Sequence, residues 1–300
     1  MTETTPSAEP GRTDATPSRT VPDRRHASAD RSRQPRPSRT KSRFARLWIP
    51  NQPGAWVMVL APAIAGTLAG GTAWRGGWVS VAWLCCYCTQ FTAARWLASH
   101  GKRRYLAPMA TYAAVTCAIG LPLLVLEPQL LWWAPFYAIV AGASFALAWM
   151  RKDRTLTSQI VSVIAAGGIG TVTAGMGNPT RTAVLVGVIF AVFEFGQLLF
   201  VPSMAVGRRN VGNGTGIGTG VPQTVRRYYA ASVALSAAMT AAGFLLHPII
   251  GAAGVLLLAR AAILPPAAWH GRIPPLTAAP CELVTSAAMI VAVALAAPVV

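Results

Sequence analysis

From Gly54 onward, long runs of apolar residues alternate with short polar breaks. Each run has about 17–22 residues, which is the length that an α-helix needs to cross the hydrocarbon core of a bilayer. The pattern therefore predicts an all-α fold, a polytopic bundle of about nine transmembrane helices. We expect them at about 54–71, 77–98, 107–126, 129–150, 156–176, 181–203, 226–246, 248–265 and 279–298. Arg260, Pro265 and Pro266 are expected to shorten the eighth helix.

Residues 1–46 have the opposite composition, being rich in Thr, Pro, Ser, Arg and Asp with almost no large apolar side chains. Such a segment cannot bury enough apolar surface to offset the conformational entropy that ordering would cost. We therefore expect two parts, a disordered basic cytoplasmic tail at 1–46 and a transmembrane helical domain at 47–300. The first apolar run begins too far along the chain for a cleaved signal peptide, so the first helix is expected to act as an uncleaved anchor.

The composition supports a membrane protein over a nucleic-acid-binding protein. Of the 300 residues 53% are hydrophobic and 12% are charged, although the net charge is +17. Eleven of the 26 basic residues lie in the tail, and most of the others lie in short loops, so no folded basic face can be drawn. Membrane lipids are therefore the expected partners, with no nucleic acid.

The distribution of basic residues predicts an orientation, because Lys and Arg gather in cytoplasmic loops. With the tail placed inside, thirteen basic residues fall in inside connections and two, Arg75 and Arg181, fall outside. The thirteen are Arg95, Lys102, Arg103, Arg104, Arg151, Lys152, Arg154, Arg208, Arg209, Arg226, Arg227, Arg260 and Arg272. We expect a multi-pass protein of the inner (plasma) membrane with a cytoplasmic N-terminus and an outside C-terminus.

A few polar residues within the apolar runs are candidates for a function, because polar groups in lipid are costly. Glu194 lies in the middle of its span, and Gln197 lies three residues later on the same helix face. The candidate lining of a polar cavity is Glu194, Gln197, Glu282, Gln90, Asn51 and Gln52. Glu194 could serve a cation, a proton or a headgroup, or it could form an interhelical hydrogen bond. Glu282 could instead pair with Arg260 or Arg272.

The five cysteines, at positions 85, 86, 88, 117 and 281, all lie within apolar segments. No His lies near them in the sequence, so they are best interpreted as small helix-packing residues. We expect no metal site and no cofactor.

The segment PNQPGAWVMVLAPAIAG, at 50–66, resembles the opening motif P-x-Q-H-G-A-W of the YwiC-like membrane protein family. A looser similarity continues through RWLASHGKRRYLAP at 95–108, the region 194–209, RAAILPP at 260–266 and Glu282, and so covers about 47–298. Pro53 stands where the family usually carries His. If that His has a catalytic or metal-binding role, this chain lacks it.

The family's nine-helix layout is similar to that of UbiA-type intramembrane prenyltransferases, whose Asp-rich motifs hold Mg²⁺ and a prenyl diphosphate. The corresponding loops here, 92–106 and 204–225, contain neither Asp nor Glu, whereas Mg²⁺ requires oxygen ligands. They carry basic residues that could bind an anion directly. The candidate anion-binding residues are Arg95, Arg103, Arg104, Arg208 and Arg209.

These observations leave three hypotheses for the function. The first is a YwiC-like membrane protein that binds a lipid or small molecule in an intramembrane cavity, in a non-enzymatic or transporter-like role. The second is a UbiA-like transferase that acts on an isoprenoid, quinone or haem precursor. The third is a scaffold for a membrane complex. Whether the chain is an enzyme, and its oligomeric state, stay open at this point.

Overall fold

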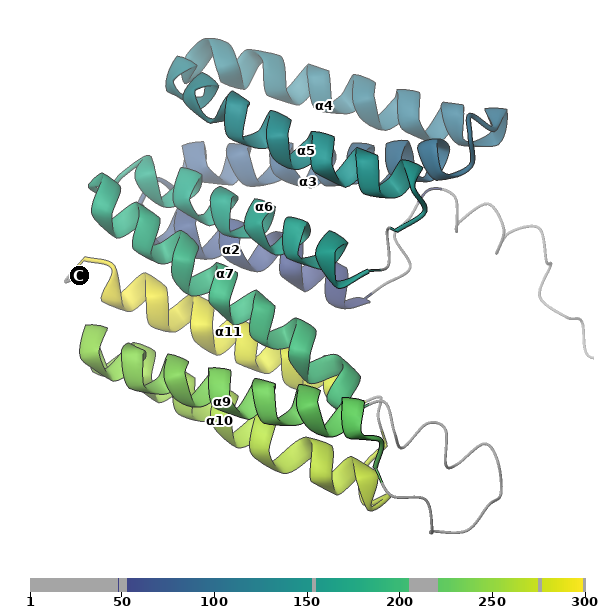
Figure 1. Ribbon diagram of the computed structural model, residues 1–300. Helices are drawn as coiled ribbons and strands as arrows, with labels where there is room; N and C mark the ends of the chain where they lie inside the picture. Colours follow the sequence, from purple (N-terminus) through teal and green to yellow (C-terminus); the bar gives the residue numbers. More distant parts are fainter. Residues whose placement is uncertain (1–47, 49–52, 153–154, 205–220, 275–276, 299–300) are drawn as a thin grey trace, which may run out of the picture. The chain divides into compact units, whose positions relative to one another are not determined.

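The computed structural model describes residues 48, 53–152, 155–204, 221–274 and 277–298, which belong to the unit Phe44–Val300. The predicted tail, residues 1–46, lies outside the described residues. Within them the regular structure is entirely helical, which confirms the all-α prediction (Figure 1). The elements are α2 (Pro53–Ala69), α3 (Ala73–Ala98), η1 (Arg103–Tyr105), α4 (Leu106–Leu126), η2 (Pro128–Trp133), α5 (Ala134–Trp149), α6 (Leu156–Gly175), α7 (Thr180–Ser203), α9 (Gln223–Leu246), α10 (Pro248–Trp269) and α11 (Ala278–Ala296).

Seven of these helices are long and apolar enough to cross a membrane, as judged by length and composition. They are α4, η2 together with α5, α6, α7, α9, α10 and α11. Of the nine predicted spans, two are not among the seven: α2 is a shorter apolar helix of 17 residues, and α3 is long but has no stretch apolar enough to be counted. The chain is therefore a multi-pass membrane protein.

The clearest difference from the predicted boundaries is in α10, which continues to Trp269 with Pro265 and Pro266 inside the helix. A proline normally weakens a helix interior because it lacks the N–H donor. Here the last turn is held by tertiary contacts, since the indole Nε1 of Trp269 donates to the carbonyl oxygen of Ser203 at 2.8 Å. The expectation that Arg260 helps to end this helix is wrong, because Arg260 lies in its middle.

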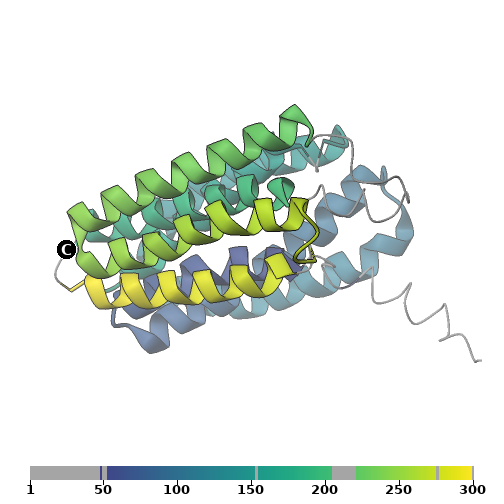
Figure 2. The same cartoon turned by 90° about the horizontal axis from the view of Figure 1, so that it is seen from below.

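The helices form two groups in space (Figure 1). Helices α3, α4 and α5 pack together, and α2, α6, α7, α9, α10 and α11 make up the larger group. α2 joins the groups because it packs against α3 as well as against α6 and α11. The antiparallel pair α9–α10 lies beside α7 and α11, as the turned view in Figure 2 also shows.

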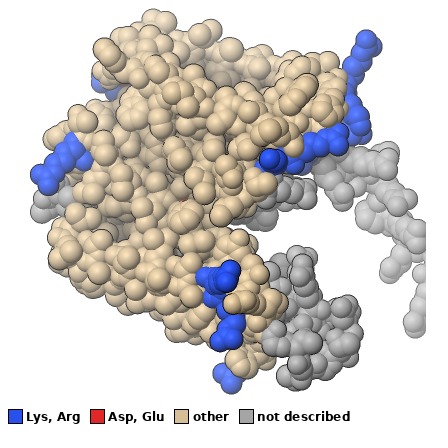
Figure 3. All heavy atoms as spheres, in the orientation of Figure 1, with Lys and Arg blue, Asp and Glu red and all other residues tan. Residues whose placement is uncertain are grey.

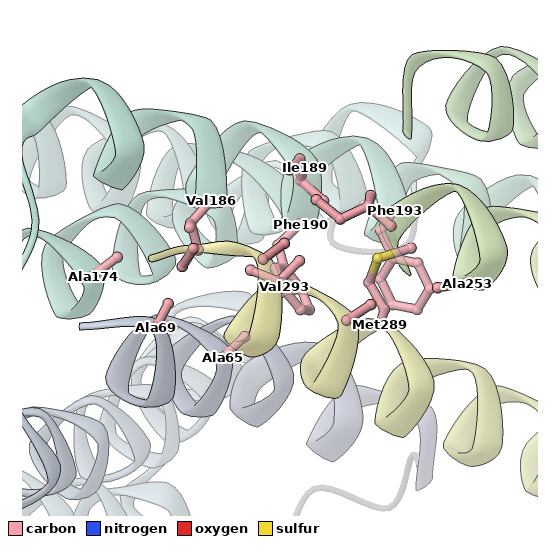
Figure 4. Packing of buried hydrophobic residues seen from close by; sticks show 14 of the residues in the cluster. Ala65, Ala69, Ala174, Val186, Ile189, Phe190, Phe193, Ala253, Met289 and Val293 are labelled. Carbon is pink, nitrogen blue, oxygen red and sulfur yellow. The ribbon is translucent and has the colours of Figure 1, made fainter. Parts of the chain in front are cut away.

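The main hydrophobic core lies where α2, α7 and α11 meet (Figure 4). Phe190 and Phe193 of α7 are 0% and 1% exposed, and they pack with Met289 and Val293 of α11. The side of this core formed by α2 is lined by alanines such as Ala65. Small residues let helix backbones approach closely in lipid, where no hydrophobic force drives helices together.

Two glycines mark the closest approaches between helices. A Cβ at Gly66 of α2 would collide with the carbonyl oxygen of Gly170 and the hydroxyl of Thr173 on α6. A Cβ at Gly187 of α7 would collide with the hydroxyl of Thr171 and would lie 2.6 Å from the carbonyl oxygen of Gly167. These glycines therefore fix the spacing of α2, α6 and α7.

The outer surface is largely apolar. In the face shown in Figure 3, Lys and Arg side chains lie toward the edges and a broad surface free of them lies between. Helix α4 and segment η2 contribute large exposed side chains, including Val125 at 80% and Trp132 at 87% exposure. Side chains of this kind are stable at a lipid surface and would be unfavourable in water.

We expect the substitution Gly66→Ala to lower the stability of the helical unit, because its new methyl group meets backbone atoms of α6 that cannot move independently. Overpacking of this kind costs about 1–3 kcal/mol. Gly142→Ala is the matched control, since a Cβ at Gly142 meets nothing within 4 Å. The measurement is the midpoint of thermal unfolding of the purified chain in detergent. Equal midpoints for the two variants would contradict the close approach of α2 and α6.

Candidate functional site

The ends of α7, α10 and α11 mark the two opposite ends of the larger helix group. At one end, here called the Trp269 end, Ser203, Trp269 and Ala278 lie close together. The indole N–H of Trp269 donates a hydrogen bond to the carbonyl oxygen of Ser203, and Ala278 packs against the hydrophobic cluster that contains Phe200 and Met204. At the other end, here called the Leu246 end, α7 and α10 begin and α9 and α11 finish. Helices α7 and α11 therefore run antiparallel.

A buried arginine connects three of these helices. Arg260 of α10 is 8% exposed. Its Nη1 donates to Oε1 of Gln197 on α7 at 2.6 Å and to Oγ1 of Thr285 on α11 at 3.1 Å. Its guanidinium carbon lies 4.0 Å from the centre of the Phe200 ring, so a cation–π interaction adds to the hydrogen bonds.

Helices α7 and α11, which accept the hydrogen bonds of Arg260, each also carry a carboxylate about one helical turn before the accepting residue. Glu194 precedes Gln197 by three residues and is 2% exposed. Glu282 precedes Thr285 by three residues, and the charges of both carboxylates act on Arg260. In the part of the chain that the structure describes, neither carboxylate forms an ion pair with Arg260, and the ion pair found there joins Arg75 to Glu127.

Because α7 and α11 are antiparallel, Glu194 lies farther from the Trp269 end than Gln197 does, whereas Glu282 lies nearer to that end than Thr285 does. With a helical rise of 1.5 Å per residue, Glu282 lies about 6 Å from the Trp269 end, Thr285 about 10 Å and Glu194 about 13 Å. The polar groups are thus spaced along the helix axis, from the Trp269 end into the interior of the bundle. Beyond Glu194 the next side chains on α7 are Phe193 and Phe190, which belong to the apolar core in Figure 4.

Several polar atoms of this group have no hydrogen-bond partner in the part of the chain that the structure describes. They include acceptors and donors, and they are Oε1 of Glu194, Oε1 of Glu282, Nε2 of Gln197, Nε of Arg260 and Oγ of Ser286. Buried polar atoms are normally paired, so each exception requires an explanation. We call Glu194, Gln197, Arg260, Glu282, Thr285 and Ser286 the Arg260 cluster.

The structure separates Gln90 from the Arg260 cluster. The Nε2 of Gln90 donates to Oγ of Ser144 at 2.6 Å, which joins α3 to α5. Neither helix contributes to the cluster. Asn51 and Gln52 lie outside the described residues.

Of the predicted anion-binding arginines, the three that the structure describes form no ion pair with Glu194 or Glu282. Arg103 and Arg104 are exposed in η1, and Nη2 of Arg104 donates to the hydroxyl of Tyr105 at 3.2 Å. The guanidinium of Arg95 lies 4.4 Å from the centre of the Phe91 ring. Arg208 and Arg209 lie outside the described residues.

Sequence reasoning did not include Arg260 among the candidate site residues, because it counted this arginine with the loop charges that set the orientation. The signal for a site was present, since Arg260 has at least one full apolar turn on each side in VLLLARAAIL. An arginine in the interior of such a run is itself a candidate. The described residues contain no group of three His, Cys, Asp or Glu side chains suited to a metal.

A hollow near the Leu246 end is separate from the cluster. It has a volume of about 240 Å³ and is lined by Arg181, Val184, Leu185, Val188 and Leu246. These residues lie in the first half of α7 and at the end of α9, whereas Glu194 and Gln197 lie in the second half of α7.

Comparison with known proteins relates the N-terminal half of the helical unit to one family. The family model "YwiC-like protein" matches residues 49–174. Over this stretch the chain is similar to the YwiC-like family. The chain is also similar to the uncharacterized protein YwiC of Bacillus subtilis (strain 168), with 25% identity over 164 residues, which cover 54% of this chain and 69% of that protein. No solved structure matches the chain.

These comparisons confirm the predicted resemblance to the YwiC-like family. The segment that the YwiC-like model matches contains α2 to α5 and most of α6. The Arg260 cluster belongs to α7, α10 and α11, which follow that segment.

We expect Gln197→Leu to destabilise the chain, because Arg260 would lose one of its two hydrogen-bond partners in a buried position. A buried charged donor left without its partner costs about 1–3 kcal/mol or more. Gln159→Leu is the control, since Gln159 is exposed in the first turn of α6. Thermal unfolding of the two purified variants should show a loss for Gln197→Leu alone. Similar losses in both variants would contradict the assigned contact.

Proposed function

We propose that this YwiC-like membrane protein binds a small polar ligand within the membrane, at the Arg260 cluster, in a transporter-like rather than an enzymatic role. The observation that carries the proposal is a buried arginine near two carboxylates, together with donors and acceptors that have no hydrogen-bond partner among the described residues. Ionisable residues in membrane helices are costly and commonly mark a substrate or ion pathway.

A small polar ligand fits this site better than a lipid chain. The unpartnered atoms include the donors of Gln197 and Arg260 and the acceptors of Glu194 and Glu282, so the site matches a molecule that both donates and accepts hydrogen bonds. The cluster is also enclosed by closely packed helices, and the apolar core of Phe190 and Phe193 closes it toward the Leu246 end. We infer that a ligand enters from the Trp269 end.

The UbiA-like transferase has less support from the contacts. A prenyl diphosphate would require several cations that converge on its phosphates. Arg103 and Arg104 are exposed in η1, while Arg260 is buried among polar partners on α7 and α11. A lipid or isoprenoid ligand is therefore the weaker expectation.

We infer that the protein lies in the plasma membrane with the Trp269 end and the N-terminus on the cytoplasmic side and the C-terminus outside. The arrangement of basic residues supports this orientation even when Arg260 is removed from the count, since twelve inside residues remain against Arg75 and Arg181. Fusion of a reporter to the C-terminus should give active alkaline phosphatase and non-fluorescent green fluorescent protein. The opposite pair of results would reverse the orientation.

Ligand binding is tested on the purified full chain in detergent. The probes are a panel of amino acids, amines and small organic acids, and the readout is the thermal unfolding midpoint. A ligand at one hundred times its Kd stabilises the folded state by about 2.7 kcal/mol, which raises the midpoint. Arg260→Gln should abolish this rise. Arg75→Gln is the control, because Arg75 pairs with Glu127 outside the cluster.

Native mass spectrometry of the same preparations identifies any molecule that purifies with the chain, and elution from a sizing column confirms that each variant is folded. A small polar adduct present in the wild type and absent from a folded Arg260→Gln variant supports the proposal. A rise in the midpoint that persists in Arg260→Gln, or a lipid or isoprenoid adduct held equally by both variants, contradicts it.

A further inference from the structure

We infer that the Arg260 cluster takes up one positive charge at Glu194, in the form of a proton or a monovalent cation. The inference rests on the proposed function, because it names the chemical class of one species that the same site binds. Three observations support it: the charges of the cluster, the burial of its side chains, and its polar atoms without a hydrogen-bond partner among the described residues.

The first step is the charge balance. The cluster contains one cationic side chain, Arg260, and two carboxylic side chains, Glu194 and Glu282. With both carboxylates ionised the cluster carries one negative charge in excess. An uncompensated charge within a membrane protein costs several kcal/mol. Addition of one proton or one monovalent cation makes the cluster neutral, whereas a second such addition would leave it positive.

The second step is to choose between the two carboxylates. Glu194 is 2% exposed and lies about 13 Å from the Trp269 end, with Oε1 unpartnered. Glu282 is only partly buried and lies about 6 Å from that end. The charge at Glu282 is therefore the better solvated of the two, and the charge at Glu194 is the one whose neutralisation stabilises the cluster most.

The third step is the set of charged groups around Glu194. Helices α2 and α6, which pack against α7, carry no titratable side chain. Helix α9 carries Arg226, Arg227, Tyr228 and Tyr229 in its first turns, α10 carries Arg260, and α11 carries Cys281 and Glu282. Of these groups, Arg260 and Glu282 are the two whose charges act on Glu194. Glu282 disfavours a second negative charge nearby, so it promotes uptake of a positive charge at Glu194.

The fourth step is the route. Glu282, Thr285 and Ser286 lie on the same side of α11 and lead from the Trp269 end toward Glu194. Oε1 of Glu282 and Oγ of Ser286 are unpartnered, so they can receive or relay a proton or contribute oxygen ligands to a cation. Past Glu194 the fully buried Phe190, Phe193 and Met289 offer no polar atom (Figure 4). Exchange of the positive charge is therefore expected with the Trp269 end alone.

A proton and a monovalent cation would each neutralise the carboxylate of Glu194. The experiment therefore has two parts, one that detects proton binding and one that detects cation binding. In the proton arm, infrared difference spectra of the purified full chain are recorded as the pH is raised. Conversion of –COOH to –COO⁻ with release of one proton removes the carbonyl band of the protonated acid. In the cation arm, the thermal unfolding midpoint is measured at constant pH while NaCl or KCl replaces choline chloride at equal ionic strength.

The key variant is Glu194→Gln, which keeps the shape of the side chain and removes its charge. The wild type should lose one protonated-carboxyl band per chain on raising the pH, or should gain a higher unfolding midpoint with Na⁺ or K⁺. Glu194→Gln should lack both responses. Glu127→Gln is the matched control, because Glu127 is also a buried carboxylate (8% exposed) but pairs with Arg75. It should keep the wild-type response.

The inference is overturned if the response persists in Glu194→Gln, or if the wild type responds to neither protons nor cations. The result is separable from that of the ligand panel. If a small polar ligand binds in an Arg260-dependent manner and Glu194→Gln leaves every titration unchanged, this inference fails and the proposed function stands. If the Glu194 response is found and no ligand binds, the proposed function fails on its own.

Discussion

Within a bilayer there is no water to solvate a charged side chain, and the C-terminal helices are arranged around this constraint. Arg260 lies in the middle of α10, where its charge must be met by partners from other helices. Gln197 and Thr285 supply oxygen atoms from α7 and α11, and the ring of Phe200 covers the guanidinium. The three helices are thereby held in one register.

The same constraint explains why small residues dominate the rest of the packing. Helices in lipid gain little from burying apolar side chains, so their association depends on close van der Waals contact. Gly66 and Gly187 bring α2, α6 and α7 together so closely that a methyl group does not fit. The aromatic core of Phe190 and Phe193 then fills the space between α7 and α11. This core is the apolar boundary of the Arg260 cluster, so packing and the candidate site depend on the same helices.

The family resemblance and the candidate site fall in different parts of the chain. Residues 49–174 match the model of the YwiC-like family and contain α2 to α5 and most of α6. The Arg260 cluster is built by α7, α10 and α11. Helices α2 and α6 of the matched segment pack directly against α7, which carries two residues of the Arg260 cluster. A role for the chain must therefore be sought in both parts together.

The sequence by itself determined the helical fold and most helix boundaries, because the length of an apolar run follows from the thickness of the bilayer. It also identified Glu194, Gln197 and Glu282 as unusual, since single polar residues in such runs are visible without a structure.

Only the tertiary structure decided which polar residues belong together. Gln90 and Glu194 look alike in the sequence, yet Gln90 joins α3 to α5. Arg260 looked like a charge at a helix end, because Pro265 and Pro266 suggested that α10 stops there. Contacts distant in sequence, such as Trp269 with Ser203 and Arg260 with Gln197, extend that helix and bury the arginine. Such contacts depend on the relative positions of whole helices, which no local pattern of residues records.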